Sequence, residues 1–243
     1  MSAPAAFPRA QRVAVEFVGT GLLLATVVGS GISGERLAAG NDALALLVNS
    51  LATGAALVAL ILAFGEVSRA HFNPLVSLFD AAMGGIAWRD VPAYALAQVS
   101  GAFVGVATAH AMFGHEAFTA SVHARQGAPQ LLSEFIATFG LIVVIWGCAR
   151  GRAGNVAFAV GGYIAAAYWF TGSTSFANPA VTLARSMTNT FSGIRPADAP
   201  GFIVAQLFGG AAATLFCRWL AASARAIEPK PAAVDSFARA PLE

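Results

Sequence analysis

Charged residues are scarce in this chain of 243 residues, of which only 11% are Asp, Glu, Lys or Arg. Soluble domains have about 25% charged residues, so this scarcity excludes an ordinary soluble protein. Hydrophobic residues instead make up 57% of the sequence. The composition therefore indicates an integral membrane protein that contacts the lipid bilayer. A net charge of +2 gives no reason to expect a nucleic-acid partner.

Cysteine is almost absent too, and both cysteines, Cys148 and Cys217, lie inside apolar segments. Two distant, membrane-embedded thiols form neither a disulfide framework nor a metal-ligand spacing. The sequence also lacks an ATP-binding loop and a paired nucleophile and base. We therefore expect no metal, no cofactor and no enzymatic activity.

Long apolar runs, by contrast, are abundant. A helix of about 20 residues crosses the hydrocarbon core of a bilayer, which is about 30 Å thick. The run that begins at Val13 is too long for the apolar region of a signal peptide. The sequence thus predicts an all-α membrane protein, with spans at roughly 13–34, 43–65, 91–113, 131–149, 153–172 and 200–222.

Two Asn-Pro pairs, Asn73-Pro74 and Asn178-Pro179, interrupt the apolar sequence. Asn is a favoured helix N-cap, and Pro is favoured at the first helical position. We expect short helices at about 74–84 and 179–190, each about 15 Å long and therefore unable to cross the membrane. Irregular backbone at membrane depth is tolerated only where protein buries it or water reaches it. Two such helix starts therefore indicate a pore.

The two halves of the chain repeat each other. Glutamates open the first and fourth spans, an Asn-Pro pair follows the second and fifth, and a glutamine lies in the third and sixth. Three spans per half force the halves to run through the membrane in opposite senses, which places the solute path near the midplane. Small residues expected to let the helices pack closely there are Gly101, Gly105, Gly209 and Gly210.

The distribution of basic residues predicts the orientation. With the N-terminus inside, the outer side holds only four of them, and the inner side holds the rest. Cytoplasmic loops are richer in Lys and Arg, so both termini are expected in the cytoplasm. The predicted channel domain covers residues 1–226, with repeats at about 11–113 and 131–225, and 227–243 form a tail. The four outer arginines are Arg36, Arg125, Arg185 and Arg195.

These motifs resemble the major intrinsic protein family, the aquaporins and aquaglyceroporins, over almost the whole chain. The resemblance implies a right-handed bundle of six spans and two re-entrant half-helices, assembled as a homotetramer with one pore per protomer. It implies that two glutamates and two glutamines, Glu16, Glu134, Gln98 and Gln206, hold the half-helix loops. It also implies a pore centre made of His71, Phe72, Asn73, Pro74, Leu75, Asn178, Pro179 and Ala180.

Some positions depart from the family's pattern. Leu75 replaces the usual Ala of the first motif, and Arg69 stands where Gly is usual. The filter arginine, three residues after the second Asn, is replaced by Val181. Counting without gaps places the other filter residues at Thr53, Ala166 and Ser175, although a gap in the loop after the fifth span would shift Ala166.

Such a filter would be wide and uncharged. The stretch Ser-Phe-Ala-Asn-Pro-Ala-Val-Thr closely resembles a bacterial subgroup associated with arsenic-resistance operons. The resemblance therefore implies a passive channel in a bacterial inner membrane. Its expected solutes are water, glycerol, trihydroxy arsenic or antimony, and methylated arsenicals.

Several residues allow two interpretations. Asn73 and Asn178 could be helix caps only, or caps that also face the pore. His71 could be a neutral hydrogen-bonded wall residue or a pH gate. Arg185, one helical turn beyond Val181, could be a displaced filter cation at the outer vestibule or a surface residue paired with Asp198 or Glu116. The corresponding residue of the first repeat, Asp80, could face a vestibule or pair with Arg69 or Arg89.

Other functions also remain open at this point. Intramembrane acids often relay protons, so an ion-coupled transporter that uses Glu16 or Glu134 is one alternative. A water-selective aquaporin and a structural junction protein with a closed pore are others. A channel would give solute flux into vesicles that ignores a proton gradient, which a coupled transporter would not.

Overall fold

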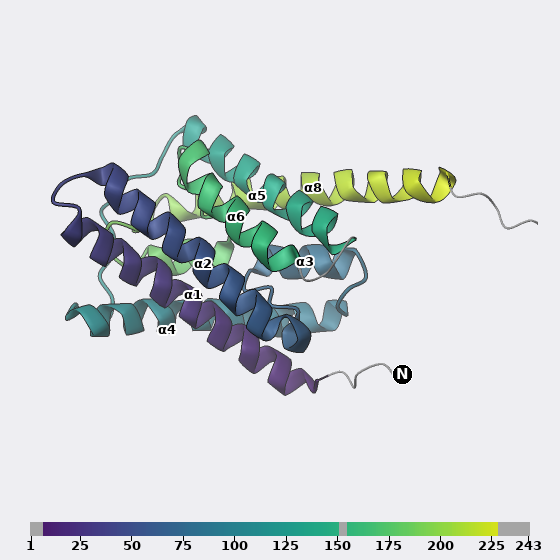
Figure 1. Cartoon of the computed structure of the whole chain (residues 1–243), viewed down its shortest axis with the longest axis horizontal. Coiled ribbons are helices and arrows are strands. Elements are labelled where there is room, and N and C mark those ends of the chain that lie inside the picture. Colours follow the sequence, from purple (N-terminus) through teal and green to yellow (C-terminus); the bar gives the residue numbers. More distant parts are fainter. Residues whose placement is uncertain (1–6, 151–154, 228–243) are drawn as a thin grey trace, which may run out of the picture.

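The computed structural model describes residues 7–150 and 155–227, with side chains to Ala222. In this part of the chain the regular structure is helical, and the long helices lie side by side along one direction (Figure 1). The elements in chain order are α1 (Arg9–Leu37), α2 (Asp42–Ser68), α3 (Pro74–Ala82), η1 (Trp88–Asp90), α4 (Val91–Phe113), α5 (Ala128–Ala149), α6 (Asn155–Phe170), α7 (Pro179–Arg185) and α8 (Ala199–Ile227).

Five of the described helices are long and apolar enough to cross a membrane, namely α1, α2, α4 with η1, α5 and α8. The predicted span at 153–172 corresponds to α6, which has 16 residues. Its first predicted residues lie outside the described part of the chain. The multi-pass architecture expected from the apolar runs is therefore confirmed.

The two Asn-Pro helices are shorter than the sequence predicts. α3 has 9 residues and α7 has 7, and each begins at its proline. α7 stops early because hydroxyl side chains compete for its carbonyl groups, as Ser and Thr do near helix ends. The Ser186 Oγ donates to the carbonyl oxygen of Leu183 at 2.7 Å, and a turn follows.

The helices of each half cross at glycines. α1 packs on α2 and α4, α5 packs on α6 and α8, and α2 packs on α6 between the halves. A Cβ on Gly101 of α4 would collide with the carbonyl oxygen of Phe17 in α1. A Cβ on Gly209 of α8 would collide likewise with the carbonyl oxygen of Phe135 in α5. Close helix approach therefore occurs at equivalent places in the two repeats.

Gly210 was also predicted to allow close helix packing, but it is not needed for it. A Cβ there would lie 3.8 Å from Thr138 Cγ2, which is an ordinary contact. A further close crossing, which the sequence did not predict, joins α2 to α6. A Cβ on Gly54 would lie only 2.8 Å from the carbonyl oxygen of Gly161.

Charged and apolar residues are separated along the bundle. Asp90 bonds Arg9 and Arg12 near the start of α1, while Arg36 donates to the Phe113 carbonyl oxygen at the opposite end. Between the ends, exposed apolar side chains such as Phe208, with 66% of its surface accessible, form the outer surface. This distribution suits a protein surrounded by lipid.

Replacing Gly105 with Ala should destabilise the contact between α1 and α4. The new Cβ would meet the carbonyl oxygen of Gly21, a backbone atom, and such overpacking costs about 1–3 kcal/mol. Gly162 in α6 is the matched control, because a Cβ there has no atom within 4 Å. Gly162→Ala should be neutral or stabilising by up to about 1 kcal/mol. Equal thermal midpoints of the two variants in detergent would contradict this packing.

Candidate functional site

The two short helices begin at asparagine caps. The Asn73 Oδ1 accepts a hydrogen bond of 2.9 Å from the backbone N–H of Leu75. The Asn178 Oδ1 accepts hydrogen bonds from the N–H groups of Ala180 and Val181, at 3.0 and 3.3 Å. The caps satisfy N–H groups that lack a partner at every helix start.

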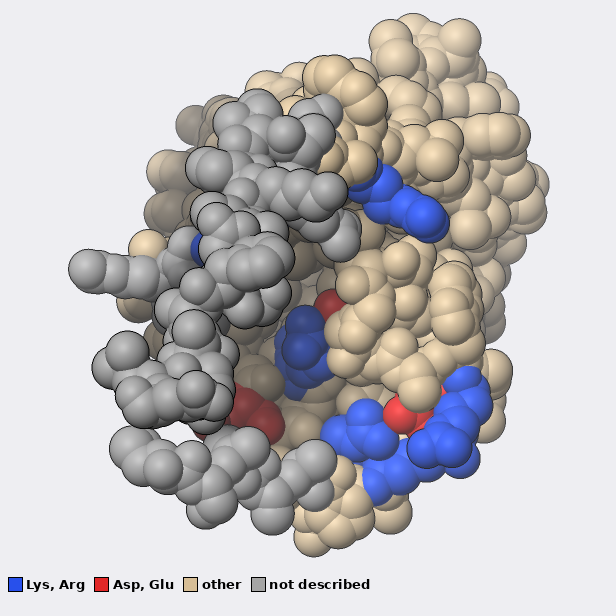
Figure 2. Space-filling view, turned by 90° about the vertical axis from the view of Figure 1, so that its right-hand side faces the viewer, with Lys and Arg blue, Asp and Glu red and all other residues tan. Residues whose placement is uncertain are grey.

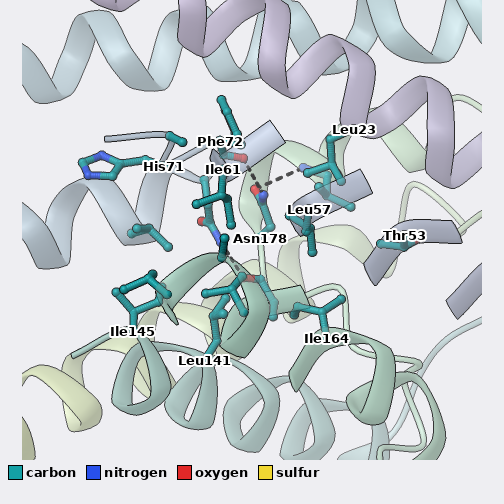
Figure 3. Close-up of a pocket in the computed structure, with 18 of the residues that line it drawn as sticks. Leu23, Thr53, Leu57, Ile61, His71, Phe72, Leu141, Ile145, Ile164 and Asn178 are labelled. Carbon is teal, nitrogen blue, oxygen red and sulfur yellow. Dashed lines mark hydrogen bonds between the residues drawn. The ribbon is translucent and has the colours of Figure 1, made fainter. Parts of the chain in front are cut away.

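The same two side chains join the halves of the molecule. The Asn73 Nδ2 donates to the carbonyl oxygen of Ala177 at 2.8 Å, and the Asn178 Nδ2 donates to the carbonyl oxygen of Phe72 at 2.8 Å. Figure 3 shows Asn178 and Phe72 facing each other in this way. Each asparagine therefore caps its own helix and binds the loop of the other repeat.

The loops before the caps have an unusual and matching backbone. Left-handed φ angles occur four, three and one residues before each Asn, at Arg69, Ala70 and Phe72 and at Thr174, Ser175 and Ala177. None of these residues is glycine, and the left-handed conformation costs such residues about 1–2 kcal/mol each. Both loops must therefore be held by bonds from outside.

Buried glutamates supply those bonds. The carboxylate of Glu16, fully buried, accepts the N–H groups of His71 and Phe72 at 3.0 and 2.7 Å. The carboxylate of Glu134, also fully buried, accepts the N–H groups of Phe176 and Ala177, both at 2.9 Å. Each glutamate therefore binds the two residues directly before its asparagine.

The glutamines complete the network in both repeats. The Gln98 Nε2 donates to Glu16 at 2.7 Å and to the Ser77 Oγ at 3.0 Å. The Gln206 Nε2 donates to Glu134 at 2.6 Å and to the Thr182 Oγ1 at 2.9 Å. Ser77 and Thr182 both lie one helical turn into the half-helices. Because the carboxylate oxygens already accept several donors, the geometry favours an anchoring role for the glutamates over a proton relay.

A cavity of about 410 Å³ runs past the asparagines. Figure 3 shows His71 at one end of its wall, Thr53 at the other, and Asn178 between them. Apolar side chains from five helices form most of the wall, namely Leu23, Val27, Leu57, Ile61, Val76, Leu141, Ile145, Val156, Val160 and Ile164. An apolar wall with a few polar groups is typical of a binding site or path for small solutes.

Most predicted pore residues line this cavity, whereas a few do not. Those that line it are Thr53, His71, Phe72, Asn73, Asp80, Ser175, Asn178, Val181 and Arg185. Pro74, Pro179 and Ala180 lie in the first turns of the half-helices, outside the lining. Leu75 points elsewhere, since its side chain packs beside Gly210 of α8.

The prediction that Ala166 is a filter residue was wrong. Ala166 is exposed on the outside of α6 and does not line the cavity. Ile164 and Tyr168 line it instead, because residues four apart share one face of a helix. Ala166, two residues from each of them, lies on the opposite face. The Tyr168 hydroxyl lies 3.2 Å from the Thr53 Oγ1, so an aromatic side chain occupies the space that Ala166 was expected to leave open.

Arg185 is not a surface residue. It exposes 2% of its surface, its Nε donates to the carbonyl oxygen of Ser192, and its guanidinium carbon lies 3.5 Å from the centre of the Phe176 ring. The predicted partner Asp198 is taken by Arg195 and by the backbone N–H of Arg125, both at 2.8 Å. Burial alone would raise the pKa of Asp198, but these hydrogen bonds and the nearby Arg195 charge hold it below the ordinary value. The pairing of Arg185 with Asp198 or Glu116 was therefore wrong.

At the end of the cavity away from Arg185, Asp80 forms an ion pair and also lines the cavity. Its carboxylate bonds Arg69 at 2.8 and 2.9 Å, and the His71 Nε2 lies 3.3 Å away. The other ring nitrogen of His71, Nδ1, lies 3.0 Å from the Ser77 Oγ. Both ring nitrogens therefore have polar partners. Figure 2 shows this end of the molecule hollowed, with acidic and basic side chains within the hollow.

The described part of the chain contains no group of three His, Cys, Asp or Glu side chains placed to hold a metal ion. The polar groups of the cavity are instead amides, hydroxyls, one histidine and charged residues near the mouths. Such a lining can exchange hydrogen bonds with a passing solute.

Comparisons with known proteins agree with this architecture. The family model described as major intrinsic protein matches residues 5–155 and 148–239. The chain is 53% identical to the aquaglyceroporin AqpS of Rhizobium meliloti (strain 1021) over 221 residues, covering 91% of this chain and 94% of that protein. It is 36% identical to the aquaporin NIP1-1 of Oryza sativa subsp. japonica over 187 residues, covering 74% and 65%.

Among solved structures, the aquaglyceroporin from Plasmodium falciparum has the same fold. The TM-score is 0.68, with 23% sequence identity, and the match covers 87% of this chain and 95% of that chain. At this identity the likeness concerns the fold.

Replacing Asn178 with Ala should impair assembly and conduction. The change removes a cap, which costs about 1 kcal/mol. It also leaves a buried carbonyl group of Phe72 without its donor, which costs about 1–3 kcal/mol more. Asn41 is the matched control, because it caps α2 by accepting from the Leu44 N–H at the exposed end of the bundle. Asn41→Ala should lose only the cap and keep its water flux, whereas normal flux through a well-folded Asn178→Ala would contradict the central role.

Replacing Glu134 tests the anchoring role. Glu134→Leu leaves three buried donors without an acceptor, at about 1–3 kcal/mol each, and should prevent assembly. Glu134→Gln keeps one oxygen toward two of these donors and should retain much of the fold and flux. Size-exclusion profiles and vesicle water flux measure both variants. Solute accumulation by the wild type, driven by a proton gradient and abolished in Glu134→Gln, would instead support a proton relay.

Proposed function

Since this chain belongs to the major intrinsic protein family, we propose that its pore passes small hydroxylated solutes of about glycerol size together with water. The chain is a multi-pass membrane channel through which water and small solutes move passively. The proposal concerns which solutes pass, and it rests mainly on Val181.

Val181 supports the proposal because it lines the cavity at the family's arginine position with neither a charge nor a donor. Thr53, Tyr168 and Ser175 also line the cavity, and the Tyr168 hydroxyl lies 3.2 Å from the Thr53 Oγ1. The Tyr168 ring makes the constriction narrower than the predicted Ala166 would, and the Tyr168 hydroxyl adds a polar group. Glycerol offers hydroxyl groups for such positions and a carbon chain for the apolar wall.

The centre of the pore favours uncharged solutes. α3 and α7 both begin there, at Asn73 and Asn178, so the positive ends of their dipoles face the same region. Such helix ends oppose the passage of cations in aquaporin-type pores. Neutral trihydroxy arsenic or antimony and methylated arsenicals combine hydroxyl groups with a similar size, and we include them among the proposed solutes. Similarity to an aquaglyceroporin supports a path wider than that of a water-selective channel.

The rival functions have less support. A transporter would need a carboxylate free to exchange protons, but Glu16 and Glu134 are committed to loop and glutamine donors. A water-selective aquaporin would be expected to keep the filter arginine, which is Val181 here. A closed junction protein fits poorly with a cavity that reaches from Asp80 to Arg185.

We further propose the cellular setting from the family and the charge distribution. The channel domain at 1–226, with repeats at about 11–113 and 131–225, would lie in a bacterial inner membrane as a homotetramer. Both termini would face the cytoplasm, with 227–243 as a tail, because basic residues concentrate on that side.

Val181→Arg should reduce the flux of glycerol much more than that of water. The long cation would narrow the constriction opposite Thr53, and we expect glycerol flux to fall by about tenfold, which corresponds to about 1.4 kcal/mol. Val181→Met is the control, because it adds length without charge. Stopped-flow light scattering on reconstituted vesicles measures both solutes. Equal losses of water and glycerol flux, or no loss of glycerol flux, would show that Val181 does not line the constriction.

A further inference from the structure

We propose that Arg185 provides the charge barrier of this pore from one helical turn outside the position that Val181 occupies. The inference rests on the proposed channel function and identifies the residue that excludes cations. Three observations support it: the position of Arg185, its lack of a counter-ion, and the rigidity of its surroundings.

The position places Arg185 on the path of any solute. A second hollow, of about 350 Å³, lies beside the cavity and is lined by residues of α1, α2 and the loops, among them Glu35, Asp42 and Arg125. Among the described residues, Arg185 alone lines both hollows. A solute that moves from the outer vestibule into the pore therefore passes its guanidinium.

No carboxylate among the described residues forms a close ion pair with Arg185, although Glu134 attracts its charge from a greater distance. The ion pairs among the described residues join Arg9, Arg12, Arg69, His71 and Arg195 to aspartates, and none includes Arg185. Within the described ranges the only hydrogen bond of its side chain runs from Nε to the carbonyl oxygen of Ser192. Burying a charge without a partner is costly, so a purely structural role would be better served by a neutral side chain.

The neighbouring residues Arg125 and Arg195 use more of their guanidinium nitrogens in hydrogen bonds. Arg125 donates from Nε to the Gly193 carbonyl oxygen at 2.9 Å and from Nη1 to the Ser173 carbonyl oxygen at 3.1 Å. Arg195 bonds Asp198 at 2.8 Å. Both of these side chains hold loops together, whereas the terminal nitrogens of Arg185 remain available to the cavity.

The guanidinium is also held in place. Its carbon lies 3.5 Å from the centre of the Phe176 ring, and the guanidinium carbon of Arg125 lies 5.2 Å from the same centre. The ring packs edge-on against Phe202, and the Phe176 N–H is bound by Glu134. A fixed charge in a water-poor passage repels cations more strongly than a mobile charge in water. Glu134, which holds the second loop, therefore also helps to position the charge of Arg185 through Phe176.

The test removes the charge and measures cation leak beside neutral flux. Wild type and Arg185→Met are reconstituted in vesicles, and proton entry is followed with an internal pH-sensitive dye under a potassium diffusion potential. We expect proton entry through Arg185→Met to rise by about tenfold, and water flux measured in the same vesicles reports whether the pore is assembled and open. Arg36→Met is the control at the same end of the bundle, because Arg36 lines neither hollow.

Three further variants make the result decisive. Arg185→Lys keeps a cation and should keep the barrier. Val181→Arg combined with Arg185→Met moves the charge inward by one turn and should restore the barrier. If Arg185→Met fails to assemble, Arg185→Gln retains an N–H donor for the Ser192 carbonyl group and takes its place in the same measurement.

The outcomes separate the two proposals. Normal water flux with unchanged proton entry in Arg185→Met or Arg185→Gln would overturn the barrier role and leave the channel function intact. Equal increases in Arg36→Met and Arg185→Met would also overturn it, because a leak would then not depend on the pore. A wild type that passes neither water nor glycerol would overturn the channel function and the barrier together.

Discussion

The pore depends on two buried carboxylates that bind backbone N–H groups. The loops at 69–72 and 174–177 contain non-glycine residues with left-handed backbone angles, and such loops do not keep this shape unaided. Glu16 and Glu134 compensate by accepting the two N–H groups before each asparagine. Hydrogen bonds to an ionised acceptor are the stronger kind, and both carboxylates are fully buried, which shields these bonds from solvent. The carboxylates therefore determine where both half-helices start.

The contacts at the centre of the pore depend on these two anchored loops. Asn73 and Asn178 can exchange hydrogen bonds with the opposite loops only because both loops are held at the same depth. The left-handed positions of the two loops before the asparagines then match residue for residue. A change in one half therefore reaches the other through two hydrogen bonds at the pore itself.

The repeats match in structure but differ in charge at the mouths. Asp80 and Arg185 both lie seven residues after their asparagine, yet Asp80 is neutralised by Arg69 and Arg185 has no carboxylate partner. Arg69 adopts a left-handed backbone conformation, with φ of 72°, that glycine would adopt at lower cost. Its bidentate bond to Asp80 offsets part of this strain. The two mouths therefore differ in pairing, because Asp80 is held in an ion pair and Arg185 is not.

The sequence by itself determined the membrane class, the paired helix starts at Pro74 and Pro179, and the recurrence of a glutamate and a glutamine in each half, whose anchoring role was implied by the family resemblance. These features depend on composition, local capping and repetition, which are visible in a single chain. It did not determine the outer filter, where Tyr168 lines the cavity in place of Ala166 and Arg185 is buried. Which face of α6 meets the pore depends on the Gly54–Gly161 crossing and on the length of the loop after Phe170. The burial of Arg185 depends on how the segments on either side of α7 fold back to bring Phe176 and Ser192 to it, and capping and composition do not decide such contacts.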